Sequence, residues 1–282
     1  KRGERIISLP LFFSLPTEAK QTRSLRKKHS LCAQNKEKKQ MENETYKVYE
    51  ADSLLKNISY PGRGIILGTA PDKKHFALAY FISGRSENSR NRVFEKTSDG
   101  TLRTIPFDPS KVTDPSLIIY NAVRQLQTNT IVTNGDQTDT VFEGLSQGKT
   151  FSESLESRCF EPDFPNFTPR ISGILYAGDE NKAKYELSIL KSADENGSAC
   201  HRYTFSYAPI AGIGHFIRTY INDGNPLPTF SGEPVRVAIP DTADRFADLL
   251  WNALNEENKI SLYVRYIDIA TGTYTDRLIN KH

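Results

Sequence analysis

From Tyr46 onward, the order of apolar and polar residues is mostly typical of short β-strands. The longest apolar run covers residues 75–83 and predicts a strand that is buried on both faces. Turn residues such as Asn134-Gly135 and Thr271-Gly272 separate many of the shorter runs. The predicted strands are residues 64–68, 75–83, 116–120, 130–133, 171–176, 185–191, 202–207, 216–221, 235–239 and 260–269.

Two segments have the spacing of amphipathic helices instead. Residues 138–147 place three apolar side chains on one side and end before a glycine. Residues 241–256 follow a proline, which favours Asp241 as the N-cap, and a weaker helix is predicted over 152–158. No linker or repeat divides residues 41–282, so the pattern predicts one α+β domain in which helices cover the apolar faces of large sheets.

The first forty residues have a different charge from the rest of the chain. They contain eleven Lys and Arg and three Glu, a net charge of +8, which leaves −5 for residues 41–282 because the whole chain carries +3. A mildly acidic domain argues against a general nucleic-acid binder. The apolar run after Arg5 is broken by polar residues and is followed by no signal-cleavage pattern. We therefore expect residues 1–40 to be a disordered leader or extension before a natural start at Met41.

Composition excludes several classes of protein. The chain has 282 residues, of which 37% are hydrophobic, and it has no run of about 18 apolar residues that would span a membrane. Its three cysteines, Cys32, Cys159 and Cys200, have neither the number nor the spacing of a disulfide framework or a zinc site. Common hydrolase and kinase motifs are absent. We expect a cytoplasmic protein that needs no metal or other cofactor.

Two arginine-bearing loops are candidate anion sites. Residues 83–92 follow the long apolar run and contain three arginines among serines and asparagines. Guanidinium groups and hydroxyls suit phosphate or carboxylate ligands, although a solvated polar loop explains the composition equally well. Arg63 lies in Tyr60-Pro61-Gly62-Arg63-Gly64, where glycines permit close approach of a ligand and a simple turn is the alternative.

Three further polar segments could take part in binding or proton transfer. Tyr120-Asn121 ends a predicted strand, and the turn at 133–139 is either a hairpin turn or a polar turn that leads into a helix and binds an anion or a heterocycle. Residues 161–170 contain three prolines and two carboxylates. A desolvated carboxylate there would have a raised pKa and could act as a general acid or base, whereas the alternative is a structural crossover with an internal Asp–Arg pair.

In their order and spacing, these segments resemble the archaeal-type IMP cyclohydrolases over roughly residues 58–221. The resemblance implies a four-layer αββα sandwich like that of the N-terminal-nucleophile hydrolases. It also implies closure of the purine ring, the last step of de novo inosinate synthesis. The segments that carry the resemblance are Gly62-Arg63-Gly64, Ser83-Gly84-Arg85-Ser86, Asn91-Arg92, Tyr120-Asn121, Asn134-Gly135-Asp136, Glu161-Pro162-Asp163 and Thr168-Pro169-Arg170.

Ring closure of the formamido-imidazole-carboxamide ribonucleotide is intramolecular, so it needs positioning and proton transfer but no metal or covalent nucleophile. We predict that arginines hold the 5′-phosphate and orient the formyl oxygen, and that Tyr120 and Glu161 move protons. The predicted catalytic residues are Tyr120, Glu161 and Arg92. The predicted substrate-binding residues are Arg63, Arg85, Ser86, Asn91, Asn121, Asn134, Gly135, Asp136, Asp163, Thr168 and Arg170.

Other functions stay open at the level of the sequence. One is an amide hydrolase on the same fold with Cys159 as its nucleophile, and another is a purine-nucleotide sensor without catalysis. RNA binding through the 85–92 loop is disfavoured by the acidic domain. We expect purine nucleotides as ligands and neither a nucleic acid nor a membrane as a partner. Edge strands of large sheets leave a homo-oligomer open.

Overall fold

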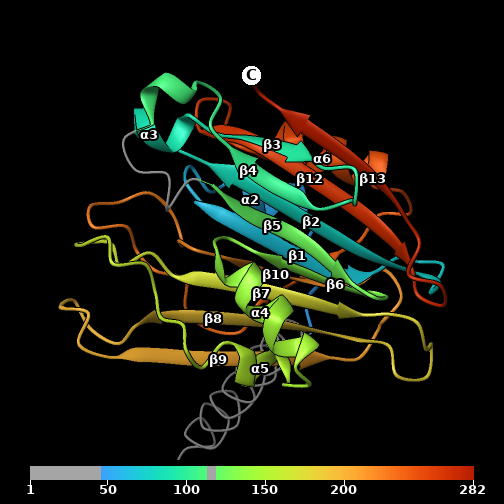
Figure 1. The fold of residues 1–282 in the computed structure, drawn as a ribbon. Coiled ribbons are helices and arrows are strands. Elements are labelled where there is room, and N and C mark those ends of the chain that lie inside the picture. The colour runs from blue at the N-terminus through green and yellow to red at the C-terminus, as the bar shows by residue number, and fades with distance from the viewer. Residues whose placement is uncertain (1–45, 113–118) are drawn as a thin grey trace, which may run out of the picture. The chain divides into compact units, whose positions relative to one another are not determined.

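The computed structural model describes residues 46–112 and 119–282, and residues 48–282 form one compact unit. The predicted leader, residues 1–40, and most of the predicted strand at 116–120 lie outside the described residues. Two antiparallel sheets dominate this unit (Figure 1). Among the described residues, no helix has the length and apolar character required to cross a membrane.

The first sheet has six strands in the order β11-β10-β1-β2-β12-β13. All its neighbouring strands pair antiparallel. Its strands are β1 (Arg63–Thr69), β2 (His75–Ser83), β10 (Ile213–Arg218), β11 (Val235–Ala238), β12 (Lys259–Asp268) and β13 (Tyr274–Asn280).

The second sheet has seven strands in sequence order from β3 to β9, again all antiparallel. Its strands are β3 (Val93–Lys96), β4 (Leu102–Ile105), β5 (Tyr120–Leu126), β6 (Asn129–Thr133), β7 (Arg170–Tyr176), β8 (Lys184–Ser192) and β9 (Cys200–Tyr207).

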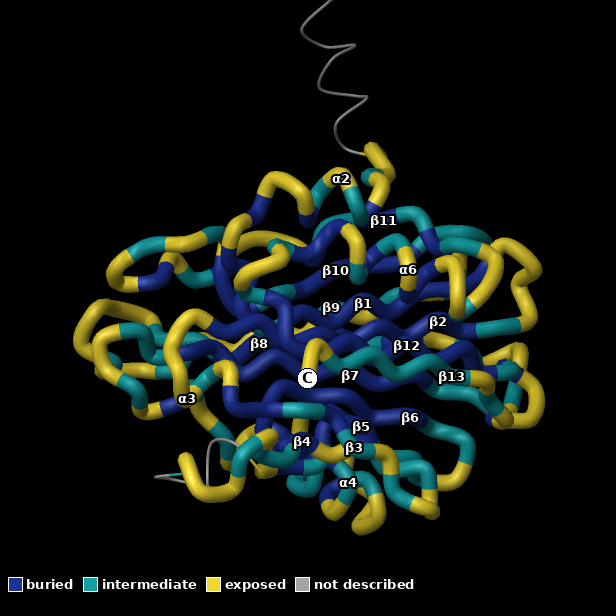
Figure 2. Tube along the Cα trace, turned by 90° about the horizontal axis from the view of Figure 1, so that it is seen from above, coloured by how far each residue is buried: buried dark blue, intermediate teal, exposed yellow. Residues whose placement is uncertain are grey.

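The main core lies between the two sheets. Side chains alternate along a strand, so Ile65 and Leu67 of β1 face this core together with residues of β7 and β8 such as Ile171 and Leu187. The intervening Ile66 faces the other way, into a second cluster. Both faces of β1 and β2 are therefore buried, which Figure 2 shows for the central strands. This confirms the prediction for residues 75–83.

Helices pack on the outer face of each sheet. Helices α2 (Ala51–Lys56) and α6 (Ala243–Ala253) cover the six-stranded sheet through residues such as Leu55 and Phe246. Helices α4 (Gln137–Ser146) and α5 (Phe151–Ser154) cover part of the seven-stranded sheet and lie in front of it in Figure 1. The structure is thus an α+β sandwich of two sheets with few helices, and α4 and α6 confirm the two main helix predictions.

Several local predictions differ from the structure. Tyr120 begins β5 instead of ending a strand, and the N-cap of α6 is Thr242, whose hydroxyl accepts a hydrogen bond from the Arg245 N–H at 3.3 Å, instead of Asp241. Part of the predicted 83–92 loop is a one-turn helix, α3 (Glu87–Arg90). The strands β3, β4 and β13 and the helix α2 were not predicted.

Candidate active site

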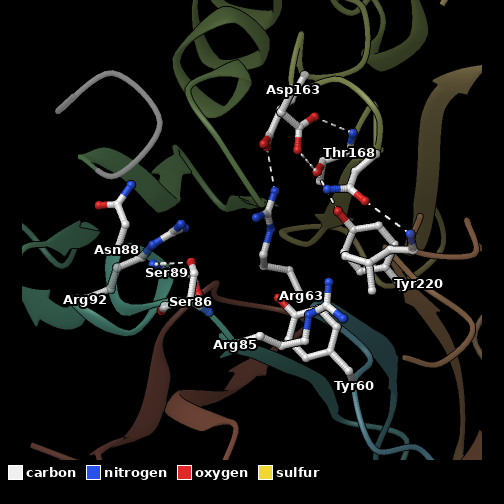
Figure 3. Close-up of a pocket in the computed structure, with 13 residues that line it drawn as sticks. Tyr60, Arg63, Arg85, Ser86, Asn88, Ser89, Arg92, Asp163, Thr168 and Tyr220 are labelled. Carbon is white, nitrogen blue, oxygen red and sulfur yellow. Dashed lines mark hydrogen bonds and ion pairs between the residues drawn. The ribbon is translucent and has the colours of Figure 1, made fainter. Parts of the chain in front are cut away.

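A cavity of about 510 Å³ opens at one end of the two sheets. Arg63 shares the inward face of β1 with Ile65 and Leu67, so the alternation that builds the core carries its guanidinium into the space between the sheets. Figure 3 shows Arg63 at the centre of the site. The lining residues are Tyr60, Arg63, Arg85, Ser86, Asn88, Ser89, Arg92, Glu161, Asp163, Asn166, Thr168, Tyr220 and Leu227.

Arg63 and Glu161 form a buried ion pair in this cavity. Arg63 Nη2 donates to Glu161 Oε1 at 2.5 Å, and the side chains are 12% and 9% exposed. Burial raises the pKa of Glu161 above its usual value, although the positive charges of Arg63 and Arg170 oppose this shift. Burial by itself would lower the pKa of Arg63, but Glu161 and the neighbouring tyrosines together raise this pKa above its usual value, so Arg63 stays charged. A carboxyl with a raised pKa next to a fixed cation is suited to accepting and returning a proton.

Arg92 is the cation of this site for which the described residues supply no acidic partner. It is 7% exposed and lines the cavity. In the described part of the chain it forms no ion pair, and its Nε has no hydrogen-bond partner. Because an isolated buried charge is costly, this arginine is arranged for an anionic ligand.

Ser86 and Ser89 lie beside Arg92 on the cavity wall (Figure 3). Their side chains form a capping box at α3, in which Ser86 Oγ accepts from the Ser89 N–H at 3.2 Å and Ser89 Oγ accepts from the Ser86 N–H at 3.0 Å. Asn91 fixes the same loop from behind, because its amide exchanges two hydrogen bonds with the backbone of Asp108. Asn91 therefore supports the site and is not among the residues that line the cavity.

Arg85 stands at the more exposed rim. It forms an ion pair with Asp223, donates to the Gly224 carbonyl at 3.0 Å and lies over the Tyr60 ring at 5.0 Å from its centroid. Its side chain is 38% exposed. Unlike Arg92, Arg85 already has a carboxylate partner, which an anionic ligand would have to replace.

A chain of hydrogen bonds closes the opposite side of the cavity. Thr168 donates its hydroxyl to Asp163 Oδ2 at 2.5 Å and its backbone N–H to Asp163 Oδ1 at 2.6 Å. Since the Thr168 hydroxyl proton is used in this way, its oxygen accepts from the hydroxyl of Tyr220 at 2.5 Å. Burial raises the pKa of Tyr220, so it stays protonated at neutral pH and holds this donor role.

Tyr220 also packs against Tyr60 and Leu227. The two tyrosine rings are stacked with centroids 5.9 Å apart. Gly62, at φ +71°, allows this packing because a Cβ there would lie 2.1 Å from Thr219 Oγ1 and 2.6 Å from the Tyr220 ring. Gly62 therefore makes room for the side chains of Thr219 and Tyr220, whereas the sequence analysis predicted that it makes room for a ligand.

Tyr120 lies behind this site and does not line the cavity. It is 5% exposed, and its hydroxyl is 2.8 Å from that of Tyr80 in the core between the sheets. Both tyrosines are near enough to Arg63 to affect its pKa. Tyr120 is therefore placed to act through Arg63.

Four other predicted binding residues form a network that supports the loop of Glu161. Asn134 accepts from the Ile171 N–H at 2.9 Å and donates to the Pro169 carbonyl at 2.9 Å. Arg170 donates to Asp136 at 2.7 Å, and a Cβ at Gly135 would meet Arg170 Nη1 at 2.6 Å. None of these four residues lines the cavity.

Asn121 lies in a different place. As the second residue of β5 it points to the outer face of its sheet, where its amide donates to Asp139 at 3.0 Å in a separate open depression. The altered start of the strand explains this orientation, since successive side chains point to opposite faces. Cys159 is exposed and is likewise absent from the cavity lining.

Seven predicted residues come together in the cavity, and six others were missed. The seven are Arg63, Arg85, Ser86, Arg92, Glu161, Asp163 and Thr168. The missed residues are Tyr60, Asn88, Ser89, Asn166, Tyr220 and Leu227. Four of these lie inside or beside the motifs identified in the sequence, but Tyr220 and Leu227 flank the turn at 222–226 and carry no local signal of function.

Across the residues that the structure describes, no group of three or more His, Cys, Asp or Glu side chains is arranged to hold a metal ion. The site instead combines a buried carboxyl, several hydroxyl groups and a buried arginine to which the described residues offer no acidic partner. A two-sheet sandwich with such a cavity is typical of a binding protein or enzyme, and the charges and hydroxyl groups of this cavity suit a small anionic ligand.

Comparison with known proteins shows which family this chain belongs to. The family model described as "IMP cyclohydrolase-like protein" matches residues 60–272, and the chain belongs to this family. It is 27% identical to an IMP cyclohydrolase of Methanocaldococcus jannaschii over 74% of this chain and 94% of that protein. It is 32% identical to an IMP cyclohydrolase of Methanopyrus kandleri over 40% of this chain and 57% of that protein. It is 36% identical to an IMP cyclohydrolase of Haloarcula marismortui over 34% of this chain and 48% of that protein.

Proposed function

We propose that this chain is an IMP cyclohydrolase, which closes the ring of 5-formamidoimidazole-4-carboxamide ribonucleotide to give IMP and water. The observation that carries the proposal is the cavity of this family member. A carboxyl with a raised pKa and an arginine that has no acidic partner among residues 46–112 and 119–282 line the same space. The substrate matches these two features. Its phosphate is an anion that an arginine can bind, and its carboxamide and formamido groups lose and gain protons as the ring closes.

In the proposed reaction, the carboxamide nitrogen attacks the formyl carbon and forms a ring that bears a hydroxyl group. Glu161 accepts the proton that the carboxamide nitrogen loses and delivers it to the formyl oxygen, which becomes this hydroxyl. Glu161 then accepts the proton of the former formamide nitrogen and gives it to the hydroxyl, whose C–O bond breaks as the ring C=N bond forms and water leaves. Arg63, held 2.5 Å from Glu161, stabilises the negative charge that develops on the formyl oxygen. No covalent bond to the protein forms, and every atom of the substrate is recovered in IMP and water.

We assign the phosphate to Arg92, with the Ser86 hydroxyl as a donor beside it. Ser89 holds this loop in place, because its own hydroxyl donates to the Ser86 carbonyl at 2.9 Å. Arg85 would join them if the phosphate replaces Asp223 as its partner. Asp163, Thr168 and Tyr220 shape the opposite wall. Tyr120 and Arg170 act on the charges of Arg63 and Glu161 without lining the cavity, and we propose them as positioning residues.

The arrangement of layers supports a finer proposal about the fold. Two stacked antiparallel sheets with helices on both outer faces agree with the αββα sandwich of N-terminal-nucleophile hydrolases. We further propose that the reaction takes place in the cytoplasm, because both substrate and product are charged nucleotides of a biosynthetic reaction.

The test is to incubate the full chain with the formylated ribonucleotide and to follow formation of the hypoxanthine ring by ultraviolet absorbance. We expect ring closure well above the spontaneous rate. Binding of IMP without any acceleration would instead support a nucleotide sensor. If the chain showed no binding and no turnover, the proposal would be refuted. An amidase activity that is lost in Cys159→Ala would then support the hydrolase alternative.

A further inference from the structure

Four strands form the outer edges of the two sheets, and three of them are protected against pairing with another chain. Tyr49 covers β11, since its N–H donates to the Arg236 carbonyl and its own carbonyl accepts from the Ala238 N–H. The strand β3 has only four residues, and β13 carries the charged residues Asp276 and Arg277. Short length, charge and covering segments are the usual means by which proteins block edge-to-edge association.

The fourth edge, β9, has none of these protections in the part of the chain that the structure describes. It has eight residues, and Arg202 is the only Asp, Glu, Lys or Arg among them. Five of the eight side chains are exposed, including Tyr203 at 44%. Within the described part of the chain, the backbone of β9 pairs with β8 on one side and with no strand on the other (Figure 1). A long open edge with little charge is a template for an additional strand.

We propose that β9 pairs antiparallel with β9 of a second copy of this chain, so that the two seven-stranded sheets become continuous. The sequence of β9 is self-complementary about a twofold axis at Thr204. In that register Tyr203 lies opposite Phe205 of the second copy, and Arg202 lies opposite Ser206. Cross-strand aromatic pairs stabilise antiparallel strands, and the single arginine does not meet its own symmetry mate.

This interface lies next to the loop that carries Glu161. Arg202 of β9 donates to the Leu155 carbonyl at 3.0 Å, just before that loop. Gly197, in the turn before β9, is so close to Phe167 that a Cβ would lie 2.8 Å from the ring. Pairing of β9 therefore braces the segments against which the Glu161 loop packs.

The test compares the mass of the full chain in solution with that of two matched variants, by light scattering after size exclusion at several protein concentrations. Thr204→Lys places two like charges opposite each other at the proposed axis. Thr275→Lys introduces the same change at an exposed threonine of the other long edge strand, β13. We expect a dimer for the wild type and for Thr275→Lys, and a monomer for Thr204→Lys.

A wild-type monomer at all concentrations would overturn the proposal, and so would a dimer that survives Thr204→Lys. Because Thr204 is exposed in the single chain, its replacement should leave the fold intact, which circular dichroism checks. If it does not, Tyr203→Lys provides a second variant on the same edge. The measurement does not involve ring closure, so its outcome is independent of the proposed activity.

Discussion

At the scale of single residues, two of the three arginines that line the cavity are in different electrostatic situations. Arg63 is neutralised by Glu161, whereas Arg92 is buried to a similar degree without an acidic partner among the described residues. The first pair is suited to chemistry and the second cation to binding. This division of roles makes the two residues separable by experiment.

Replacing Arg92 with methionine should weaken IMP binding by about ten- to a hundredfold, because hydrogen bonds to charged groups contribute about 1.5–3 kcal/mol. Isothermal calorimetry with IMP measures the effect. Arg103→Met is the matched control, since Arg103 is a half-exposed arginine on β4 that pairs with Glu95. Equal affinities of Arg92→Met and the wild type would contradict the assignment of the phosphate.

The raised pKa of Glu161 predicts a pH dependence of turnover. As a proton acceptor, Glu161 must be ionised, so kcat should fall as the pH decreases through a value above the ordinary carboxyl pKa. The profile of kcat against pH measures this acidic limb. If the same limb persisted in Glu161→Gln, the titrating group would be a different residue.

At the residue scale, the sequence identified the charged half of the site better than the aromatic half. Arg63, Arg85 and Arg92 belong to polar motifs with an evident affinity for anions. Tyr60 and Tyr220 are 160 positions apart, and only the pairing of β1 with β10 brings them together. No local pattern contains that contact, so a single sequence cannot indicate it.

At the scale of elements, the cluster between β8, β9 and β10 contains a histidine that is held neutral. His215 Nδ1 lies 2.7 Å from the Tyr185 hydroxyl, and its ring stacks on Tyr207 at 3.5 Å. Burial lowers the pKa of His215 to about 4. The cluster connects the two sheets close to β9.

This histidine should make the protein less stable in mild acid. Between pH 6.5 and about 4 the unfolded chain binds a proton at this position and the folded chain does not, so stability falls as the pH falls. The loss of folding free energy reaches roughly 3 kcal/mol at the acid end of this range, and there is no loss above the pKa of the unfolded histidine. Urea unfolding at pH 7 and pH 5 should show a smaller loss for His215→Gln than for the wild type. An equal loss would assign the effect to other groups.

The elements that the sequence predicted best are those with a long, one-sided or two-sided apolar pattern. The strand β2 and the helices α4 and α6 have such patterns. The strands β3 and β4 have four residues each with alternating exposure, which is too short a pattern to separate from a loop. The strand predicted at 116–120 was placed too early in the sequence relative to β5, because apolar residues lie on both sides of Tyr120.

At the scale of the whole molecule, the two sheets act as a rigid frame with the cavity at one end. The residues that line it come from strand ends and from the loops around 86–92, 161–168 and 220–227. Loops on a rigid frame are a common location for binding and catalysis. The order of these loops along the chain is what made the family recognisable from sequence, whereas their convergence in space required the fold.

The proposed mechanism uses only side chains of this chain, so ring closure should not depend on a metal ion. We expect the same rate before and after treatment of the full chain with a chelator. Restoration of a lost rate by one particular divalent ion would contradict the mechanism.

The most direct test of the account is to measure ring closure by the wild type and by Glu161→Gln, together with the affinity of each for IMP. The account predicts a fall in kcat of about 10²–10⁴-fold for the variant, because it loses a proton-transfer group. It also predicts nearly unchanged affinity for IMP, because Arg92 still holds the phosphate. A variant with full activity would contradict the account and would remove this carboxyl from the reaction.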